Sequence, residues 1–190
     1  LLQRTQLLLE NGGFGILLVL LLLSLFLKPR LAFWVAFGIP ISFLGMFTFA
    51  TGADVTINVL SLFGMIIVIG ILVDDGIVIG ENIFHHFEKG KRPIPAAIDG
   101  TMEVVPPIVS AIMTTIIAFS TFFFLDGRIG NFFSEVSTIV ILTLGFSLIE
   151  ALIILPAHVA HSKSLSRHEK PFLLNVYADR FMTWMRDKVY

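Results

Sequence analysis

The sequence contains no cysteine and few charged residues. The absence of Cys among 190 residues excludes a disulfide framework and any metal site built from thiolates. Only 14% of the residues are charged, whereas soluble domains carry about 25%. The basic residues form no stripe with interleaved aromatic side chains, so the sequence does not indicate nucleic-acid binding. These shortages together argue against an ordinary soluble domain.

Long apolar blocks make up most of the chain. Hydrophobic residues account for 56% of it, and the mean hydropathy is +0.90. Crossing the hydrocarbon core of a bilayer takes roughly 20 helical residues, and helices are the default because lipid-exposed backbone must bond to itself. The sequence predicts an all-α polytopic membrane helix bundle, residues 1–160, with five spans. They are expected at about 7–27, 31–50, 59–88, 104–125 and 136–157.

The Lys and Arg residues are placed asymmetrically with respect to these spans. If the five spans alternate in direction, eleven of the 13 Lys and Arg residues fall on one side, and only Arg4 and Arg128 fall on the other. Basic loops are retained in the cytoplasm during insertion. We therefore expect the basic side and the C-terminus to be cytoplasmic and the N-terminus to lie outside.

The two ends of the chain differ from the spans. Leu1 is not preceded by an initiator Met or followed by a signal-peptide pattern, and five spans starting outside lead us to expect an upstream membrane crossing. Residues 161–190 carry apolar side chains at helical spacing, with Tyr177 and Trp184 among flanking basic residues. This pattern predicts an amphipathic helix in the cytoplasmic interface. The alternative is a helix packed on another soluble domain.

Two adjacent acids interrupt the third span. The stretch GILVDDGIVIGENI, residues 70–83, places Asp74 and Asp75 near the middle of a helix that we expect to end near Gly90. A charged side chain at that depth costs about 2.5–3.5 kcal/mol on insertion scales, so intramembrane acids indicate function. The alternative is a protonated, hydrogen-bonded pair that only fixes packing. Neighbouring side chains on a helix diverge by about 100°, so the two carboxyls point toward different partners.

Glycines surround the acidic pair. Gly70 precedes Asp74 by one turn on the same face, while Gly76 and Gly80 form a G-x-x-x-G on roughly the opposite face. Small residues allow helices to approach closely in lipid. We expect these three glycines to support helix packing around the acids.

The stretch FGMIIVIGILVDDGIVIGENI resembles the fourth transmembrane helix of the resistance, nodulation and division (RND) transporters, especially the hydrophobe and amphiphile exporters of Gram-negative bacteria. Further likeness lies in KPRLAFWVA, in a helix interrupted by Pro40, and in FSLIEALIILPAHVAH, which is similar to the sixth helix. The resemblance implies that the five spans are helices two to six of the N-terminal half of such a transporter. It implies a location in the bacterial inner membrane.

The resemblance also implies a mechanism and partners. Asp74 and Asp75 match the proton-binding pair of a proton-driven antiporter, which in that family is reached by a Lys from the other half of the membrane domain. None of the five spans contains Lys or Arg, so this stretch holds one side of the proton site. The family works as a trimer in the lipid bilayer with a periplasmic adaptor and an outer-membrane channel. We expect no cofactor, no metal and no enzymatic activity.

Other polar residues support weaker interpretations. Glu150, toward the cytoplasmic end of the last span, joins a relay or reaches the interface, and we favour the interface. Intrahelical hydrogen bonds to backbone carbonyls are expected for Ser110, Thr114, Thr115 and Thr121. Solvated positions at cytoplasmic ends, without a metal, are expected for His85, His86, His158, His161 and His168.

Two rival functions remain open at this stage. An intramembrane aspartyl protease also needs two buried acids, but its aspartates must face each other to share a proton. Adjacent positions on one helix do not allow that geometry, and the sequence has no G-x-G-D. A noncatalytic membrane scaffold would not require the pair at all.

Overall fold

The computed structural model describes residues 29–50, 52, 58–162 and 165. Among these residues there are helices and no strand, which confirms the predicted all-α class. The elements are α2 (Pro29–Ala50), α3 (Val59–Glu88), α4 (Pro93–Ser120), the 3-10 turn η2 (Thr121–Phe124), α5 (Gly127–Ile149), the π-helical turn η3 (Glu150–Ile154) and α6 (Leu155–His161). The predicted first span and nearly all of the predicted interfacial helix lie outside the described residues.

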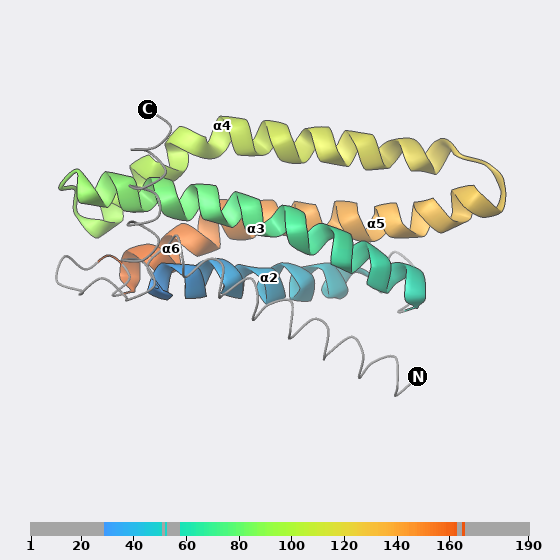
Figure 1. The fold of residues 1–190 in the computed structure, drawn as a ribbon, viewed down its shortest axis with the longest axis horizontal. Coiled ribbons are helices and arrows are strands. Elements are labelled where there is room, and N and C mark those ends of the chain that lie inside the picture. Colours follow the sequence, from blue (N-terminus) through green and yellow to red (C-terminus); the bar gives the residue numbers. More distant parts are fainter. Residues whose placement is uncertain (1–28, 51, 53–57, 163–164, 166–190) are drawn as a thin grey trace, which may run out of the picture.

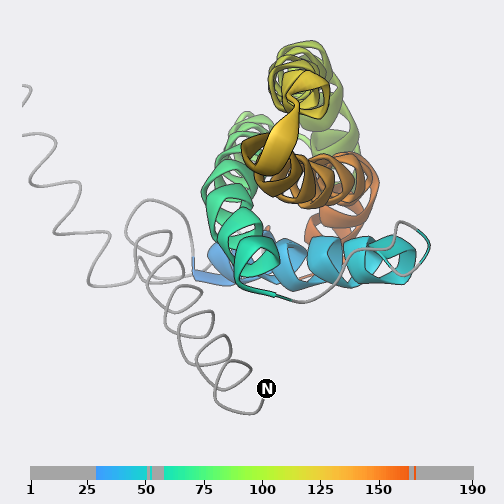
Figure 2. The ribbon, with the colours of Figure 1, turned by 90° about the vertical axis from the view of Figure 1, so that its right-hand side faces the viewer.

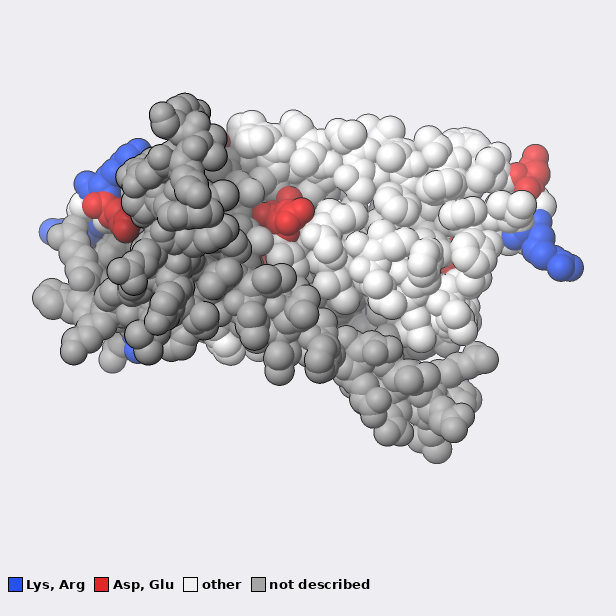
Figure 3. All heavy atoms as spheres, in the orientation of Figure 1, with Lys and Arg blue, Asp and Glu red and all other residues white. Residues whose placement is uncertain are grey.

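The helices run side by side along one long axis (Figure 1). The end where α3 stops and α2 and α4 start carries basic residues in the described part, and we name it the basic end: Arg30, Lys89, Lys91 and Arg92. The opposite end holds η2 and the start of α5, with Asp126 and Arg128. On the face shown in Figure 3, the Lys and Arg side chains of the described residues lie at the two ends, and the described surface between them shows none.

Four helical segments among the described residues are long and apolar enough to cross a membrane: Pro29–Ala50, Val59–Glu88, Pro93–Phe124 and Gly127–His161. Viewed from the end, α4 lies on the opposite side of α3 and α5 from α2 (Figure 2). Accordingly, only 11% of an 18-residue apolar stretch in the segment Pro93–Phe124 is buried inside the bundle, compared with 39% of such a stretch in α3. α4 is therefore the peripheral helix of the described bundle.

Apolar side chains both fill the bundle and cover its outside. Leu31, Val35, Val68, Ile79 and Ile83 belong to the core and are nearly inaccessible. Large apolar side chains are also exposed at many positions on the described helices, among them Phe33, Leu44, Phe49, Ile66, Ile117, Phe124 and Ile153. A helix that is apolar on all sides is typical of a membrane bundle, because lipid takes the place of water on its outer face.

α3 begins with a reciprocal cap that also ties it to α5. The Asn58 side chain accepts hydrogen bonds from the backbone N–H groups of Leu60 and Ser61, and the Ser61 hydroxyl accepts one from the Asn58 N–H. The Asn58 amide also donates to the Glu135 carboxylate on α5. Capping satisfies otherwise unpaired N–H groups at the helix start. It fixes the start of α3 at the end opposite the basic end.

Two helices start earlier than the apolar blocks indicated. α4 begins at Pro93 rather than Val104, and α5 begins at Gly127 rather than Val136. The early part of α4 carries Asp99 and Glu103, which lower its hydropathy, so the apolar blocks do not predict a helix there. Both side chains are hydrogen-bonded, Asp99 to Lys91 and Glu103 to His86. Pro40 lies inside α2 without ending it. The predicted range 59–88 coincides with α3.

Candidate functional site

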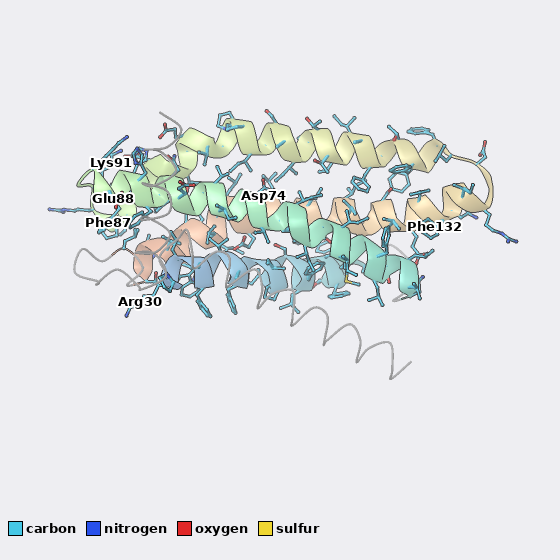
Figure 4. The ribbon with its side chains drawn as sticks, in the orientation of Figure 1. Arg30, Asp74, Phe87, Glu88, Lys91 and Phe132 are labelled. Atoms are coloured by element: carbon cyan, nitrogen blue, oxygen red, sulfur yellow. The ribbon has the colours of Figure 1, made fainter. Side chains whose placement is uncertain are left out.

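Asp74 and Asp75 lie midway along α3, where Figure 4 labels Asp74, and the two side chains differ in exposure. Asp74 is exposed, whereas Asp75 is 9% exposed. The Oδ2 atom of Asp75 is buried and has no hydrogen-bond partner among the described residues. Buried polar groups are nearly always paired, so an unpaired carboxyl oxygen marks a site that needs an explanation. The two acids thus place one carboxyl inside the bundle and one on its surface.

The Asp74 face of α3 is exposed along almost its whole length. We name it the open stripe, and its members recur every three or four residues: Phe63, Ile66, Gly70, Asp74, Val78, Glu81, His85 and Glu88. This spacing places them on one side of a helix. No described helix covers this side of α3. The open stripe combines apolar residues with the carboxylates of Asp74, Glu81 and Glu88 and with the ring of His85.

The three glycines near the acids lie in two different environments. A Cβ built on Gly76 would lie 2.8 Å from Cγ1 of Val35, and one on Gly80 would lie 3.2 Å from Cγ2 of the same residue. The G-x-x-x-G pair therefore lets α2 pack directly on α3. A Cβ on Gly70 would meet nothing within 4 Å in the described structure. The predicted close approach of a helix at Gly70 therefore concerns a helix outside the described residues.

A second polar group joins the end of α3 to the start of α4. We name it the basic-end network: Asn82, His86, Lys91, Asp99 and Glu103. His86 Nε2 lies 2.7 Å from Glu103 Oε2, and Lys91 Nζ lies 2.8 Å from His86 Nδ1 and donates to Asp99 Oδ2 at 2.6 Å. Asn82 donates to the Gly100 carbonyl at 2.7 Å and to Glu103 at 3.3 Å. Each member has at least one partner.

The position of His86 corrects the sequence interpretation. His86 was expected to be solvated, but it is 9% exposed and is held between Glu103 and Lys91. His85, His158 and His161 are exposed as expected, and the His158 ring stacks on Trp34 with centroids 4.4 Å apart. The spacing of Asn82 and His86, four residues apart on one helix face, was the available signal. The contact of His86 with Glu103 could not be predicted in this way, because it depends on how α4 packs against α3.

Glu150 also differs from the favoured interpretation. Its side chain is 6% exposed and lies within the bundle rather than at the interface. A Cβ built on Gly38 of α2 would lie 2.5 Å from Glu150 Oε1, so the carboxyl occupies space that only a glycine leaves. Glu150 starts the π-helical turn η3. The Glu150 side chain makes no hydrogen bond or ion pair with another described residue.

Three of the four hydroxyl side chains on α4 and η2 for which intrahelical bonds were predicted make them. Thr114 donates to the Ser110 carbonyl at 2.7 Å, Thr115 to the Ala111 carbonyl at 3.1 Å, and Thr121 to the Ala118 carbonyl at 2.6 Å. These intrahelical bonds satisfy the hydroxyls locally. Within the described ranges, no group of three or more His, Cys, Asp or Glu side chains is arranged to hold a metal ion.

Comparison with known proteins gives one family over nearly the whole chain. The sequence profile of the AcrB/AcrD/AcrF family matches residues 7–189. The multidrug resistance protein MdtC of Serratia proteamaculans is 34% identical over 155 residues, which are 81% of this chain and 15% of that protein. MdtC of Photorhabdus laumondii is 33% identical over 145 residues, 76% of this chain and 14% of that protein.

A third relative covers still more of the chain. A protein of Haemophilus influenzae described as an uncharacterized transporter is 31% identical over 178 residues, 93% of this chain and 16% of that protein. The matched part of each of these three relatives is about 15% of its length. The similarity thus extends across the described helices and the acidic pair.

Proposed function

Because the chain belongs to the AcrB/AcrD/AcrF family of RND efflux transporters, we propose that it forms one part of the membrane domain of a proton-driven exporter and carries its proton-binding acids. In this proposal Asp74 and Asp75 bind and release protons while the intact transporter exports amphiphilic compounds. The relatives are named for multidrug resistance, which suggests the substrate class. The chain then acts as part of a transporter and not as an enzyme.

The observation that carries the proposal is the buried, unpaired oxygen of Asp75 in the middle of an apolar span. An ionised carboxylate in that setting lacks both water and a cation, and therefore favours the protonated form until one of them arrives. A site that changes its proton occupancy when its surroundings change is what proton coupling requires. A group that only fixed packing would be expected to use both oxygens in hydrogen bonds.

The open stripe supports a second element of the proposal. Its middle presents Gly70, Asp74, Val78 and Glu81 on a face that no described helix covers. The chain spans about 15% of the length of its curated relatives, so most of the intact transporter lies beyond it. We infer that a helix from the other half of the membrane domain packs on this stripe and brings a Lys to the acidic pair.

The placement in the membrane follows from the charges. The basic end faces the cytoplasm of the bacterial inner membrane in this proposal, because Lys89, Lys91 and Arg92 all lie in the connection between α3 and α4. The acids then lie between the two aqueous sides, as antiport requires. The intact protein is proposed to form a trimer with a periplasmic adaptor and an outer-membrane channel.

The two rival functions fit the geometry less well. A protease dyad needs two carboxyls that face each other, whereas Asp74 is exposed and Asp75 is buried on the same helix. A scaffold needs no buried carboxyl. The substitution Asp75→Asn in the full-length transporter distinguishes the three functions, because Asn keeps the volume of the side chain but cannot bind or release a proton. Proton-driven export should disappear while membrane insertion and yield stay normal. Normal export by this variant would rule the proposal out.

A further inference from the structure

We propose that Glu150 is a second proton-binding carboxyl of this membrane domain, separate from the Asp74–Asp75 pair and acting with the π-helical turn that it begins. This inference rests on the proposed function. It concerns a side chain at the junction of α5 and η3 that lies against α2, whereas the acidic pair is on α3.

The first support is that Glu150 is buried and has no partner among the described residues. Its side chain is 6% exposed, and it makes no hydrogen bond or ion pair with another described residue. Its carboxyl fills the space beside Gly38, where an added Cβ would lie 2.6 Å from Cδ. An acid in such a place is stable as the neutral, protonated form, and it requires water or a cation to ionise.

The second support is the depth of Glu150 in the bundle. On α2, Val35 lies against Gly76, the neighbour of Asp75, and Gly38 lies against Glu150. Val35 and Gly38 are three residues apart, which is about 4.5 Å along a helix axis. Glu150 and Asp75 therefore lie at similar depths along the bundle. A carboxyl at the depth of the acidic pair is within the same apolar layer.

The third support is the backbone at Glu150. The N–H of Leu155 bonds to the Glu150 carbonyl, five residues earlier, which is the π-helical pattern. Pro156 follows and has no N–H to offer the carbonyl of Leu152, so a regular α-helical ladder is already broken there. Single π-helical turns occur often at functional sites. This turn gives the Glu150 side chain a backbone that can change its pattern when the carboxyl changes charge.

The ionisable groups around η3 do not supply a fixed counter-charge. The elements that pack on η3 are α2, α3, α5 and α6. Their ionisable residues in the described part are Arg30 on α2, Asp74, Asp75, Glu81, His85, His86 and Glu88 on α3, Arg128 and Glu135 on α5, and His158 and His161 on α6. None is hydrogen-bonded or ion-paired to Glu150. Asp75, which lies at a similar depth, carries the same sign of charge.

The chemistry is a reversible protonation. The Glu150 carboxylate takes one proton from one aqueous side and becomes a neutral carboxyl that fits beside Gly38. It later gives the same proton to the other side, when water reaches it through the rearranged turn. Only the O–H bond forms and breaks, and no other reactant is needed.

The test uses the full-length transporter in lipid vesicles and two substitutions with opposite properties. Glu150→Gln keeps the size of the side chain but cannot bind a proton. Glu150→Asp is shorter by one methylene and keeps the carboxyl. If Glu150 titrates during transport, Glu150→Gln should lose proton-driven export by about tenfold or more, within the usual range of coupling between sites, and Glu150→Asp should retain more of it. A role in packing alone gives the reverse order and overturns the proposal.

Infrared difference spectra recorded against pH give a readout that does not depend on export. Wild-type protein should show a protonated-carboxyl band that Glu150→Gln removes and that the double variant Asp74→Asn, Asp75→Asn retains. The matched control is Asp126→Asn, which removes an exposed carboxyl just before α5, away from the open stripe, and should leave band and export unchanged. An unchanged band in Glu150→Gln overturns this inference alone. Normal export in Asp75→Asn overturns the proposed function. The infrared result for Glu150→Gln still decides by itself whether Glu150 binds a proton.

Discussion

The basic-end network and the middle of the bundle use acidic residues in opposite ways. At the basic end, Asp99 and Glu103 are exposed and each has a partner, Lys91 or His86. In the middle, Asp75 and Glu150 are buried, and no basic side chain is paired with either in the described part. Paired acids at the rim hold two helices together. Unpaired acids in an apolar layer are poised to change their charge.

The difference also follows from what each environment does to the free energy of a charge. Exposed ion pairs contribute about 0–1 kcal/mol, because water already stabilises both charges. A buried carboxylate without a cation is far less stable, and its protonation removes most of that penalty. Structural acids are therefore tolerated freely at the ends of the bundle. An acid in the middle is expected only where its proton is of use.

The largest expected effect comes from making the same substitution in both regions. In the full-length transporter, Asp75→Asn should reduce proton-driven export by about 100-fold or more, since removing a required proton carrier typically has an effect of this size. Asp99→Asn should leave export near the wild-type level, because Asp99 is an exposed partner of Lys91. Drug efflux from vesicles with an imposed proton gradient measures both. Equal losses in the two variants would erase the distinction between the regions.

A large effect is also expected at the open stripe. Gly70→Leu should push away a helix that packs beside Asp74 and should impair export, although a side chain at Gly70 meets nothing within the described structure. Gly145 on α5 is the matched control, since it is also exposed with nothing within 4 Å. Gly145→Leu should preserve export. If Gly70→Leu is as active and as stable as wild type, no helix approaches closely there.

A smaller effect is expected from breaking the basic-end network. His86→Ala removes a buried ring that contacts Glu103 and Lys91, and should lower the free energy of unfolding by about 1 kcal/mol, the usual contribution of one hydrogen bond. Its exposed neighbour provides the control, and His85→Ala should change stability less. Unfolding of the purified transporter in mixed detergent measures both variants. Strong loss of proton coupling in His86→Ala would place this residue in the proton path instead.

The smallest effect on function is expected from the variants that locate the two regions in the membrane. Lys89→Cys, at the basic end, should be shielded from impermeant thiol reagents in intact cells, and Asp126→Cys, at the other end, should be labelled. Both residues are exposed, so export should be unaffected. The reversed labelling pattern would invert the proposed orientation.

The helices themselves were predictable from the sequence because apolar blocks of spanning length have few alternatives in lipid. The range 59–88 for α3 and the central position of Asp74 and Asp75 were read directly. The early starts of α4 and α5 were missed because charged residues precede their apolar blocks, Asp99 and Glu103 on α4 and Arg128 and Glu135 on α5, and hydropathy measures only the apolar part of a helix. Residues 7–27 stay a prediction because they lie outside the described residues.

The partners of the polar residues were less predictable than the helices. The contact between His86 and Glu103 joins residues 17 positions apart across a turn, and helical periodicity within one element does not specify it. The burial of Glu150 depends on Gly38, on a helix more than 100 positions earlier in the chain. Which face of Asp74–Asp75 is covered depends on neighbouring helices. Sequence alone indicated two diverging directions and left their surroundings open.

The placement of side-chain hydrogen bonds on α3 has a mechanical consequence. The helix is pinned at one end by Asn58 to α5 and at the other by Asn82 and His86 to α4. Across residues 62–80, which lie between these pins, the only ionisable or hydrogen-bonding side chains are Asp74 and Asp75. A beam fixed at both ends deflects most near its midpoint under a load applied there. We therefore expect that protonation of Asp74 or Asp75 bends α3 at its middle, while both ends of the helix keep their contacts with the neighbouring helices.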